Sequence, residues 1–306
     1  MKSLNGKLLK PIMWGIGIYS ILLTIFSISA HYSDTKSLEG TYKDFIEKQE
    51  ILSRIRINLL KSAEMEKNAV MALTDEESQG FADQSSAASS VVEQNLKRLH
   101  TLIDASSLHD EKKLIVEFDG CWAELHKLDQ TILELAVQNT NLKATALSRE
   151  KGAEAIGRFE HALEEIGQSS THTPKEGQVE KSIRHAITEC LKIYNLHSPH
   201  IAEASDDKMD QIEARMKAEE NEVLISLDQL SGITGEESRE SLSQSKTAFS
   251  DFMDVTAMVI KLSRQNSNIK SLELSLGKKR KVTAQCDEVL AAFQETVQGR
   301  NFKSIK

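Results

Sequence analysis

The 306-residue chain has few of the residues that interrupt helices or build sheets. It contains three prolines, and aromatic residues make up 5% of it. Proline is scarce where helices run long, because its ring removes a backbone donor and clashes with the preceding turn. No stretch alternates apolar and polar residues with the β-branched enrichment typical of strands. The sequence therefore predicts an all-α protein.

Two classes of function are excluded by what is missing. The net charge is -8 at pH 7, and no cluster of cations occurs of the kind that displaces counterions from nucleic acid. We therefore expect no nucleic-acid partner. The Gly-rich phosphate loop, the HExxH motif, the nucleophile elbow and the kinase signature are also missing. We expect no enzyme, no catalytic residues and no cofactor.

Cysteine is as scarce as proline. The three cysteines, Cys121, Cys190 and Cys286, are far apart, odd in number and without CxxC spacing. We expect them to be buried small apolar residues of a core. This pattern neither requires nor excludes an oxidising compartment.

One stretch near the N-terminus lacks charge altogether. Residues 11–30 carry no charged side chain, and as a helix they span about 30 Å, enough to cross a hydrocarbon core. The preceding residues 1–10 contain Lys2, Lys7 and Lys10 and no acid, so the positive-inside rule places them in the cytoplasm and the rest of the chain outside. The alternative is a signal peptide, whose apolar region is usually only about 7–15 residues long. We therefore expect an uncleaved anchor.

The strongest pattern that is present is a helical seam that occurs twice, 127 residues apart. Its first copy places apolar residues at steps of four and three, at Leu114, Phe118, Cys121, Leu125, Leu128, Ile132 and Leu135. Such a seam is typical of a helix packed against other helices. The segment Gln138-Asn139-Thr140-Asn141 follows the first seam, and Gln265-Asn266-Ser267-Asn268 follows the second. Eight identities in the seventeen positions from Leu135 to Lys151 indicate an internal duplication.

Each copy is expected to form its own bundle. In the first copy, short turns separate apolar-striped helices of roughly 25–30 residues, and short turns force neighbouring helices to be antiparallel. Thr74 and Glu77 have the spacing of a capping box at one of these turns. The sequence predicts a transmembrane helix followed by two tandem up-down-up-down four-helix bundles. The predicted parts are a cytoplasmic N-terminus (1–10), a transmembrane helix (11–30), a first bundle (38–168), a linker (169–178), a second bundle (179–298) and a tail (299–306).

A series of segments follows the lysine-flanked anchor in a fixed order: SRIRINLL, AEMEKNAVMAL, the acidic turn TDEES, and a helix from FDGCWAEL to LELAVQN. In this order they resemble the four-helix-bundle sensory domain of methyl-accepting chemotaxis receptors and related sensor kinases. The resemblance covers about residues 1–168. The second copy is more distant and carries mainly the segment LSRQNSNIK.

The resemblance implies a single-pass protein of the bacterial inner membrane, with a cytoplasmic N-terminus and a periplasmic bulk, acting in signal transduction or chemotaxis. It implies a homodimer that binds a small molecule or a partner membrane receptor, and that meets lipid through residues 11–30. In such receptors the last helix leads into a second span, a HAMP linker and a signalling coiled coil, and the sequence up to Lys306 contains none of these. We therefore expect a truncated receptor or a module that acts through a partner. The alternative is a tether or scaffold outside the membrane without a small ligand.

The candidate ligand-binding residues are Arg54, Arg56, Gln138, Asn139, Asn141, Gln265, Asn266 and Asn268. Receptors of this kind often hold carboxylate ligands with arginines on the first helix, and amide side chains offer both donors and acceptors. Two alternatives stay open: the arginines are solvated on different faces, and the asparagines end one helix and cap the next. His185, His197 and His200 lie near acidic residues, but Pro199 separates two of them, so we expect no metal site.

Overall fold

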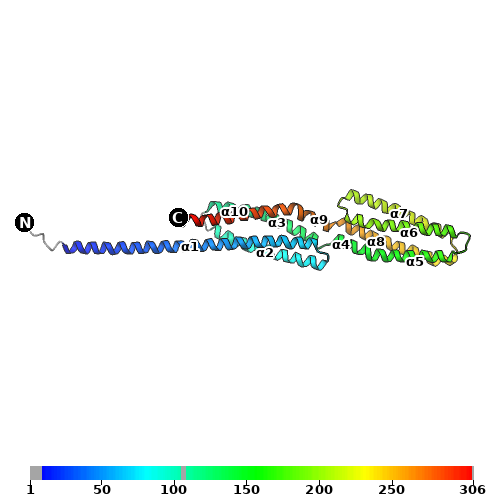
Figure 1. Cartoon of the computed structure of the whole chain (residues 1–306), viewed down its shortest axis with the longest axis horizontal. Coiled ribbons are helices and arrows are strands. Elements are labelled where there is room, and N and C mark those ends of the chain that lie inside the picture. Colours follow the sequence, from blue (N-terminus) through cyan, green and yellow to red (C-terminus); the bar gives the residue numbers. More distant parts are fainter. Residues whose placement is uncertain (1–8, 105–107, 305–306) are drawn as a thin grey trace, which may run out of the picture. The chain divides into compact units, whose positions relative to one another are not determined.

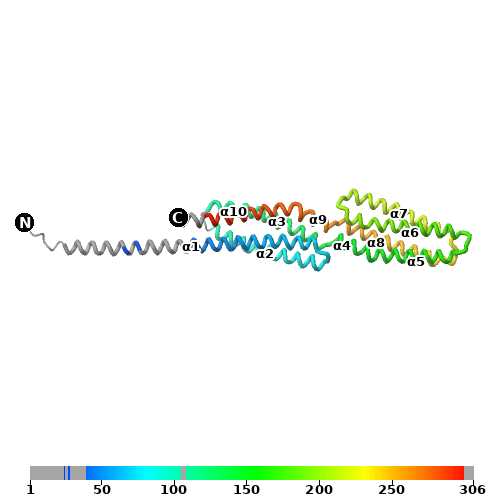
Figure 2. The backbone as a smooth tube through the Cα atoms, viewed as in Figure 1, coloured from blue at the N-terminus to red at the C-terminus, as the bar shows by residue number. Residues whose placement is uncertain are grey.

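The computed structural model describes residues 9–104 and 108–304, with side chains for residues 24, 27, 39–104 and 108–299 (Figure 2). Within these residues the regular structure is entirely helical, so the all-α prediction is confirmed. The helices are α1 (Leu9–Met71), α2 (Asp75–Asp104), α3 (His109–Ala136), α4 (Thr140–Leu147), η1 (Ser148–Gly152), α5 (Ala153–Ser169), α6 (Glu176–Ala202), α7 (Asp206–Ile233), η2 (Glu236–Ser238), α8 (Arg239–Gln265), α9 (Ser267–Leu274), η3 (Ser275–Lys279) and α10 (Arg280–Ser304). Of the three short elements, η1 and η3 are π-helical and η2 is a 3₁₀ turn.

The predicted capping box begins α2. The Glu77 N–H donates to Thr74 Oγ1 at 3.2 Å, and the Leu73 N–H donates to a Glu77 carboxylate oxygen at 3.4 Å. Side-chain oxygens thus satisfy backbone donors that the first turn of a helix leaves without an intrahelical partner.

The chain folds into two compact units, and each unit is assembled from separated segments. The first unit contains residues 1–60, 88–123 and 284–306, and the second contains residues 61–87 and 124–283. Helices α1, α2, α3 and α10 therefore contribute to both units.

The first unit has an apolar core built from α1, α2, α3 and α10. The fully buried side chains of this core include Leu52, Ile55, Leu59, Val92, Leu99, Phe118, Leu290 and Phe293. Two polar links cross the same unit. Lys48 Nζ lies 2.9 Å from Glu111 Oε2, which joins α1 to α3, and the Arg56 guanidinium pairs with Asp287, which joins α1 to α10.

A disulfide between Cys121 and Cys286 also joins α3 to α10 in the first unit, with the two Cα atoms 5.6 Å apart. All three cysteines are buried, as expected, but Cys121 and Cys286 are bonded to each other instead of serving as separate apolar residues, and Cys190 is free. The two partners are 165 residues apart in sequence. Spacing cannot reveal such a pair, because only the return of α10 to α3 brings the two sulfur atoms together.

The second unit contains a bundle of α5, α6, α7 and α8, which lie side by side in Figure 1. Its core draws buried residues from all four helices, among them Phe159, Ile193, Leu227, Phe249 and Phe252. A second cluster in the same unit packs parts of α1, α2 and α3 around Ala69, Ala82, Ile132 and Ala136, with Leu274 of α9 against it.

These cores differ from the predicted division into consecutive bundles at 38–168 and 179–298. Helix α5 belongs to the first sequence copy, but it shares its core with α6, α7 and α8. It packs against α6 and α8 (Figure 1). The predicted first bundle requires the short break at Asn139 to return the chain along the preceding helix; in the structure the helix after this break shares its core with the second copy instead.

No helix combines the length and apolarity needed to cross a membrane, among the residues whose side chains are described. The predicted span at residues 11–30 lies almost wholly outside those residues, since only Thr24 and Ser27 of it have described side chains. The backbone there belongs to the long helix α1.

Candidate functional site

The two predicted arginines on α1 are both engaged with acids of the chain. Arg56 donates from Nε to Asp287 Oδ1 at 2.6 Å and from Nη2 to Asp287 Oδ2 at 3.0 Å, which is the forked geometry that a carboxylate ligand would otherwise take. This pairing raises the pKa of Arg56. Arg54 pairs with Glu50 one turn earlier on the exposed surface. Ligand binding by these arginines stays a prediction.

The two Gln-Asn-x-Asn segments meet in the second unit, where each separates two helices. Asn139 lies between α3 and α4 with φ 50°, and Asn266 lies between α8 and α9 with φ 57°. Asparagine adopts this left-handed region more readily than most residues. Each short helix that follows has eight residues and then passes into a π-helical turn, so the duplication seen in sequence is also a duplication of local structure.

Side chains of each copy cap the helix of the other copy. We call this cluster the asparagine node; it comprises Asn139, Thr140, Asn141, Asn266, Ser267 and Asn268. The Thr140 N–H donates to Ser267 Oγ, and the Ser267 N–H donates to Thr140 Oγ1, both at 3.1 Å. The Asn141 N–H donates to Asn268 Oδ1 at 3.1 Å, and the Asn268 N–H donates to Asn141 Oδ1 at 3.3 Å. The first donors of α4 and α9 are thus satisfied reciprocally.

The amide donors of the node are used within the protein as well. Asn141 Nδ2 donates to Asn266 Oδ1 and to the Ile201 carbonyl, both at 2.8 Å. Asn268 Nδ2 donates to Asn139 Oδ1 at 3.0 Å, and Asn266 Nδ2 donates to the backbone carbonyl of Glu203 at 2.8 Å. Asn139, Asn141 and Asn266 are all buried. This geometry favours the capping interpretation over a ligand site, with the addition that the cap is exchanged between copies.

Beside the node, the backbone carbonyls of Gln138 and Gln265 accept from Lys143 Nζ at 2.8 Å and from Lys270 Nζ at 2.9 Å. Asp75 closes one side of the node. It accepts from Asn139 Nδ2 at 3.0 Å and lies 3.0 Å from Lys143 Nζ, and these two contacts lower its pKa.

The histidines singled out from the sequence lie apart from any metal geometry. His197 Nδ1 lies 2.9 Å from Ser148 Oγ, and its Nε2 lies 3.1 Å from Thr256 Oγ1. Burial lowers the pKa of His197 to about 4, so the ring is neutral near pH 7. His200 contacts Glu213, with its Nε2 2.8 Å from Oε1. In the part of the chain that the structure describes, no group of three or more His, Cys, Asp or Glu side chains could hold a metal ion.

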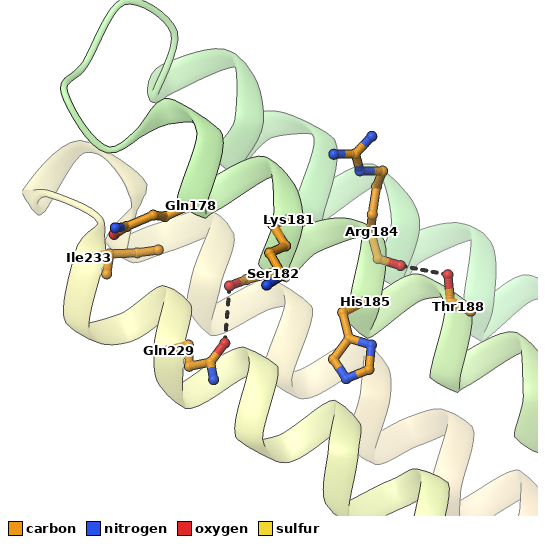
Figure 3. Close-up of a pocket in the computed structure, with 8 residues that line it drawn as sticks. All are labelled: Gln178, Lys181, Ser182, Arg184, His185, Thr188, Gln229 and Ile233. Carbon is orange, nitrogen blue, oxygen red and sulfur yellow. Dashed lines mark hydrogen bonds between the residues drawn. The ribbon is translucent and has the colours of Figure 1, made fainter.

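An open pocket of about 720 Å³ lies between α6 and α7 in the second unit (Figure 3). Its volume falls in the range of small-molecule sites. The residues that line it are Gln178, Lys181, Ser182, Arg184, His185 and Thr188 of α6, and Gln229 and Ile233 of α7.

Polar groups from both helices converge on this pocket. Ser182 Oγ donates to Gln229 Oε1 at 3.2 Å, which ties α6 to α7 across it (Figure 3). Lys181 and His185 are one helical turn apart. The His185 ring faces α7 in the figure and lies 3.2 Å from Glu222 Oε2. The Arg184 guanidinium points away from α7 in the same view, with Glu180 at 3.6 Å.

The lining therefore offers a lysine ammonium, a serine hydroxyl, two amides and an imidazole, and no acid belongs to it. Sequence reasoning missed this site. Its only signal was the spacing of Gln178, Lys181 and His185 along one helical face, and the partner face on α7 cannot be read from that spacing.

One solved structure similar to this chain is the crystal structure of the V. parahaemolyticus histidine kinase sensor TorS sensor domain. It shares 15% sequence identity at a TM-score of 0.46, and the similarity covers 84% of this chain and 99% of that chain. Among curated proteins, none matches the chain. A family match covers residues 8–176, more than half of the chain, and the family is described as a four helix bundle sensory module for signal transduction. The chain belongs to this family of four-helix-bundle sensory modules.

Proposed function

We propose that this chain is a membrane-anchored sensory module that binds a small anionic solute between α6 and α7. The family supports the sensory role, since the match covers residues 8–176. The charge-free stretch at residues 11–30 supports the anchor. The main support for an anionic ligand is the pocket between α6 and α7, whose lining includes cationic side chains and no acidic ones.

The disulfide supports a location outside the cytoplasm. Cys121 and Cys286 are bonded inside the first unit, and structural disulfides form and persist in oxidising compartments such as the bacterial periplasm. The lysines before the anchor favour the same orientation, with the N-terminus in the cytoplasm and the bulk of the chain periplasmic.

The chemistry of the pocket favours an anion with hydrogen-bonding groups. Lys181 is exposed and can turn its ammonium toward a carboxylate or phosphate oxygen, and the His185 imidazole can add a hydrogen bond. The Gln178 and Gln229 amides can accept from hydroxyl groups of the same solute or donate to its oxygens. Ile233 supplies an apolar wall at one end.

Helix α6 offers a route from the pocket to the asparagine node. The pocket lies on the N-terminal half of α6, and the carbonyls of Ile201 and Glu203 at its C-terminal end accept from Asn141 and Asn266. A solute that draws α6 toward α7 would displace this helix, in which Pro199 lies between the pocket and the node, and small helix shifts are a known form of signalling. The receiver is a partner membrane receptor or a further signalling part.

A homodimer is part of the same proposal. On α1, the exposed apolar residues Tyr42, Ile46, Ile57 and Leu60 fall within about 60° of one face at the α-helical period. Monomeric proteins rarely leave such a row open to water, and a second copy of α1 is a matching cover for it.

The proposal is tested by thermal unfolding of the full chain in detergent at low salt, with acetate, succinate, citrate and inorganic phosphate as probes. A ligand at a hundred times its Kd stabilises the folded state by about 2.7 kcal/mol, a shift of about 4 °C for a protein of this size. We expect at least one anion to raise the midpoint and Lys181→Gln to abolish the shift. The matched control is Lys261→Gln on α8, also an exposed lysine, which should leave the shift intact.

Glucose and glycerol serve as uncharged probes and should leave the midpoint unchanged. If an anion still raises the thermal midpoint of Lys181→Gln, the anion binds elsewhere and the pocket assignment is overturned. No shift with any anion, together with a specific partner in membrane crosslinking, favours the tether or scaffold.

A further inference from the structure

A buried ionic cluster lies inside the second unit, away from the pocket between α6 and α7. Lys279, the last residue of the π-helical turn η3, points its ammonium at two carboxylates. Its Nζ lies 2.6 Å from Glu66 Oε2 of α1, and it also forms an ion pair with Asp129 of α3. We call these three residues the buried triad.

The triad is removed from water. The side chains of Lys279, Glu66 and Asp129 are 2%, 0% and 5% exposed. Two carboxylates and one ammonium leave one uncompensated negative charge at neutral pH. Glu66 Oε1 is buried, and no described residue gives it a hydrogen bond. An isolated buried charge is costly, and a site of this kind relieves the cost by binding a cation or a proton.

Among the described residues, the groups around the triad include no second lysine or arginine that pairs with its carboxylates. Helix α1 adds the Ser62 hydroxyl, which bonds to Asp129, and α2 adds Ser85, which is bonded to Ser62 at 3.0 Å. Helix α3 adds His126, whose charged form would lower the pKa of Asp129. The neighbouring Lys278 is directed outward to Glu124 at 2.8 Å.

We propose that the buried triad binds one exchangeable proton, held on Asp129, so that the packing of η3 against α1 and α3 responds to the pH outside the membrane. Two carboxylates that share one ammonium in an apolar interior cannot both ionise cheaply. Asp129 Oδ1 is buried and faces Lys279 without a hydrogen bond of normal geometry, and burial raises the pKa of Asp129 more than Lys279 lowers it. The proton is thus a second chemical signal, bound between α1, α3 and η3, and its site does not depend on the solute pocket.

The sign of the effect follows from the raised pKa of Asp129. The folded state holds this proton more tightly than the unfolded state does, so its stabilising effect is present at low pH and is lost as the pH rises through the folded pKa. Each unit of pKa difference is a tenfold change in the unfolding equilibrium. Asp75 and Glu213 have lowered pKa values and therefore contribute with the opposite sign, so the difference between wild type and variant is the quantity to follow.

The test uses the full chain in detergent and compares wild type with Asp129→Asn, which imitates the protonated side chain. We expect the ratio of unfolding constants between wild type and variant to change about tenfold or more between pH 5.5 and pH 8, with the variant gaining relative stability at the higher pH. The matched control is Glu111→Gln, which removes the carboxylate from the buried pair with Lys48. This control should be destabilised at both pH values, because Lys48 loses its buried partner Glu111 and keeps the exposed Asp44.

Infrared spectroscopy measures the proton directly in the wild type. We expect the carbonyl stretch of a protonated carboxyl group in the wild type at pH 5.5, and its loss in Asp129→Asn. Absence of this band in the wild type between pH 5.5 and pH 8 overturns the proposal. A band that persists in a folded Asp129→Asn protein also overturns the assignment to Asp129.

Discussion

Replacement of Asn141 by alanine tests the reciprocal cap of the asparagine node. This side chain accepts from the Asn268 N–H and donates to Asn266 Oδ1 and to the Ile201 carbonyl. Alanine removes all three hydrogen bonds and leaves the Asn268 N–H, Asn266 Oδ1 and the Ile201 carbonyl without this partner. Asn141 is 7% exposed, so water reaches these groups poorly.

The expected loss follows from the number of bonds. A typical protein hydrogen bond contributes about 1 kcal/mol net, and a buried group left without a partner costs about 1–3 kcal/mol. Asn141→Ala should therefore lower the free energy of unfolding by about 3 kcal/mol or more. For a chain of this length we expect the thermal midpoint to fall by roughly 5 °C or more.

The assay is thermal and urea unfolding followed by circular dichroism, with Asn58→Ala as the matched control. Asn58 lies on α1 and bonds only the Arg54 carbonyl one turn earlier at the surface, so its replacement should cost less than about 0.5 kcal/mol. The double variant Asn141→Ala with Asn268→Ala should cost less than the sum of the two single variants, because the two side chains share the same bonds. Equal effects of Asn141→Ala and Asn58→Ala would refute the reciprocal cap.

Three further outcomes follow from the described contacts. Reduction of the Cys121–Cys286 disulfide should destabilise the protein by about 2–5 kcal/mol, because the bond closes a long loop; unfolding with and without reductant checks this, and a Cys121→Ser variant should show no effect of reductant. Lys48→Met should cost about 3–5 kcal/mol by leaving Glu111 charged and buried, and a second substitution, Glu111→Gln, should recover much of the loss in chemical denaturation. His197, with its pKa lowered to about 4 by burial, should cost about 3 kcal/mol of stability as the pH falls from 7 to 4, and a folded His197→Gln variant with the same pH profile as wild type would contradict this.

Much of the local structure could be predicted from the sequence. The steps of four and three from Leu114 to Leu135 correspond to the buried face of α3, where Phe118, Leu125 and Ile132 are almost fully buried. The spacing of Thr74 and Glu77 located the start of α2 to within a residue. Such signals are readable because they depend on groups within a few turns of each other.

Less of the candidate site could be predicted from the sequence. The Gln-Asn-x-Asn segments were recognised as special, but their amides bond to each other across the two copies instead of facing a ligand. The pocket residues Ser182 and Gln229 are 47 positions apart and have no shared sequence signal. The disulfide could not be predicted either, because its two cysteines lie on α3 and α10, which are far apart in the sequence.

The sequence by itself determined the helical class, the apolar face of each helix, the breaks at Asn139 and Asn266 and the duplication that relates them, because all of these depend on local spacing and local backbone preference. Only the tertiary structure decided that α5 shares a core with α6, α7 and α8, that α10 is bonded to α3, and that the two asparagine segments cap each other. The physical reason is that apolar stripes are nearly interchangeable as partners. An apolar stripe shows that one face of a helix must be buried. Which helix buries it depends on the direction that the chain takes after each break.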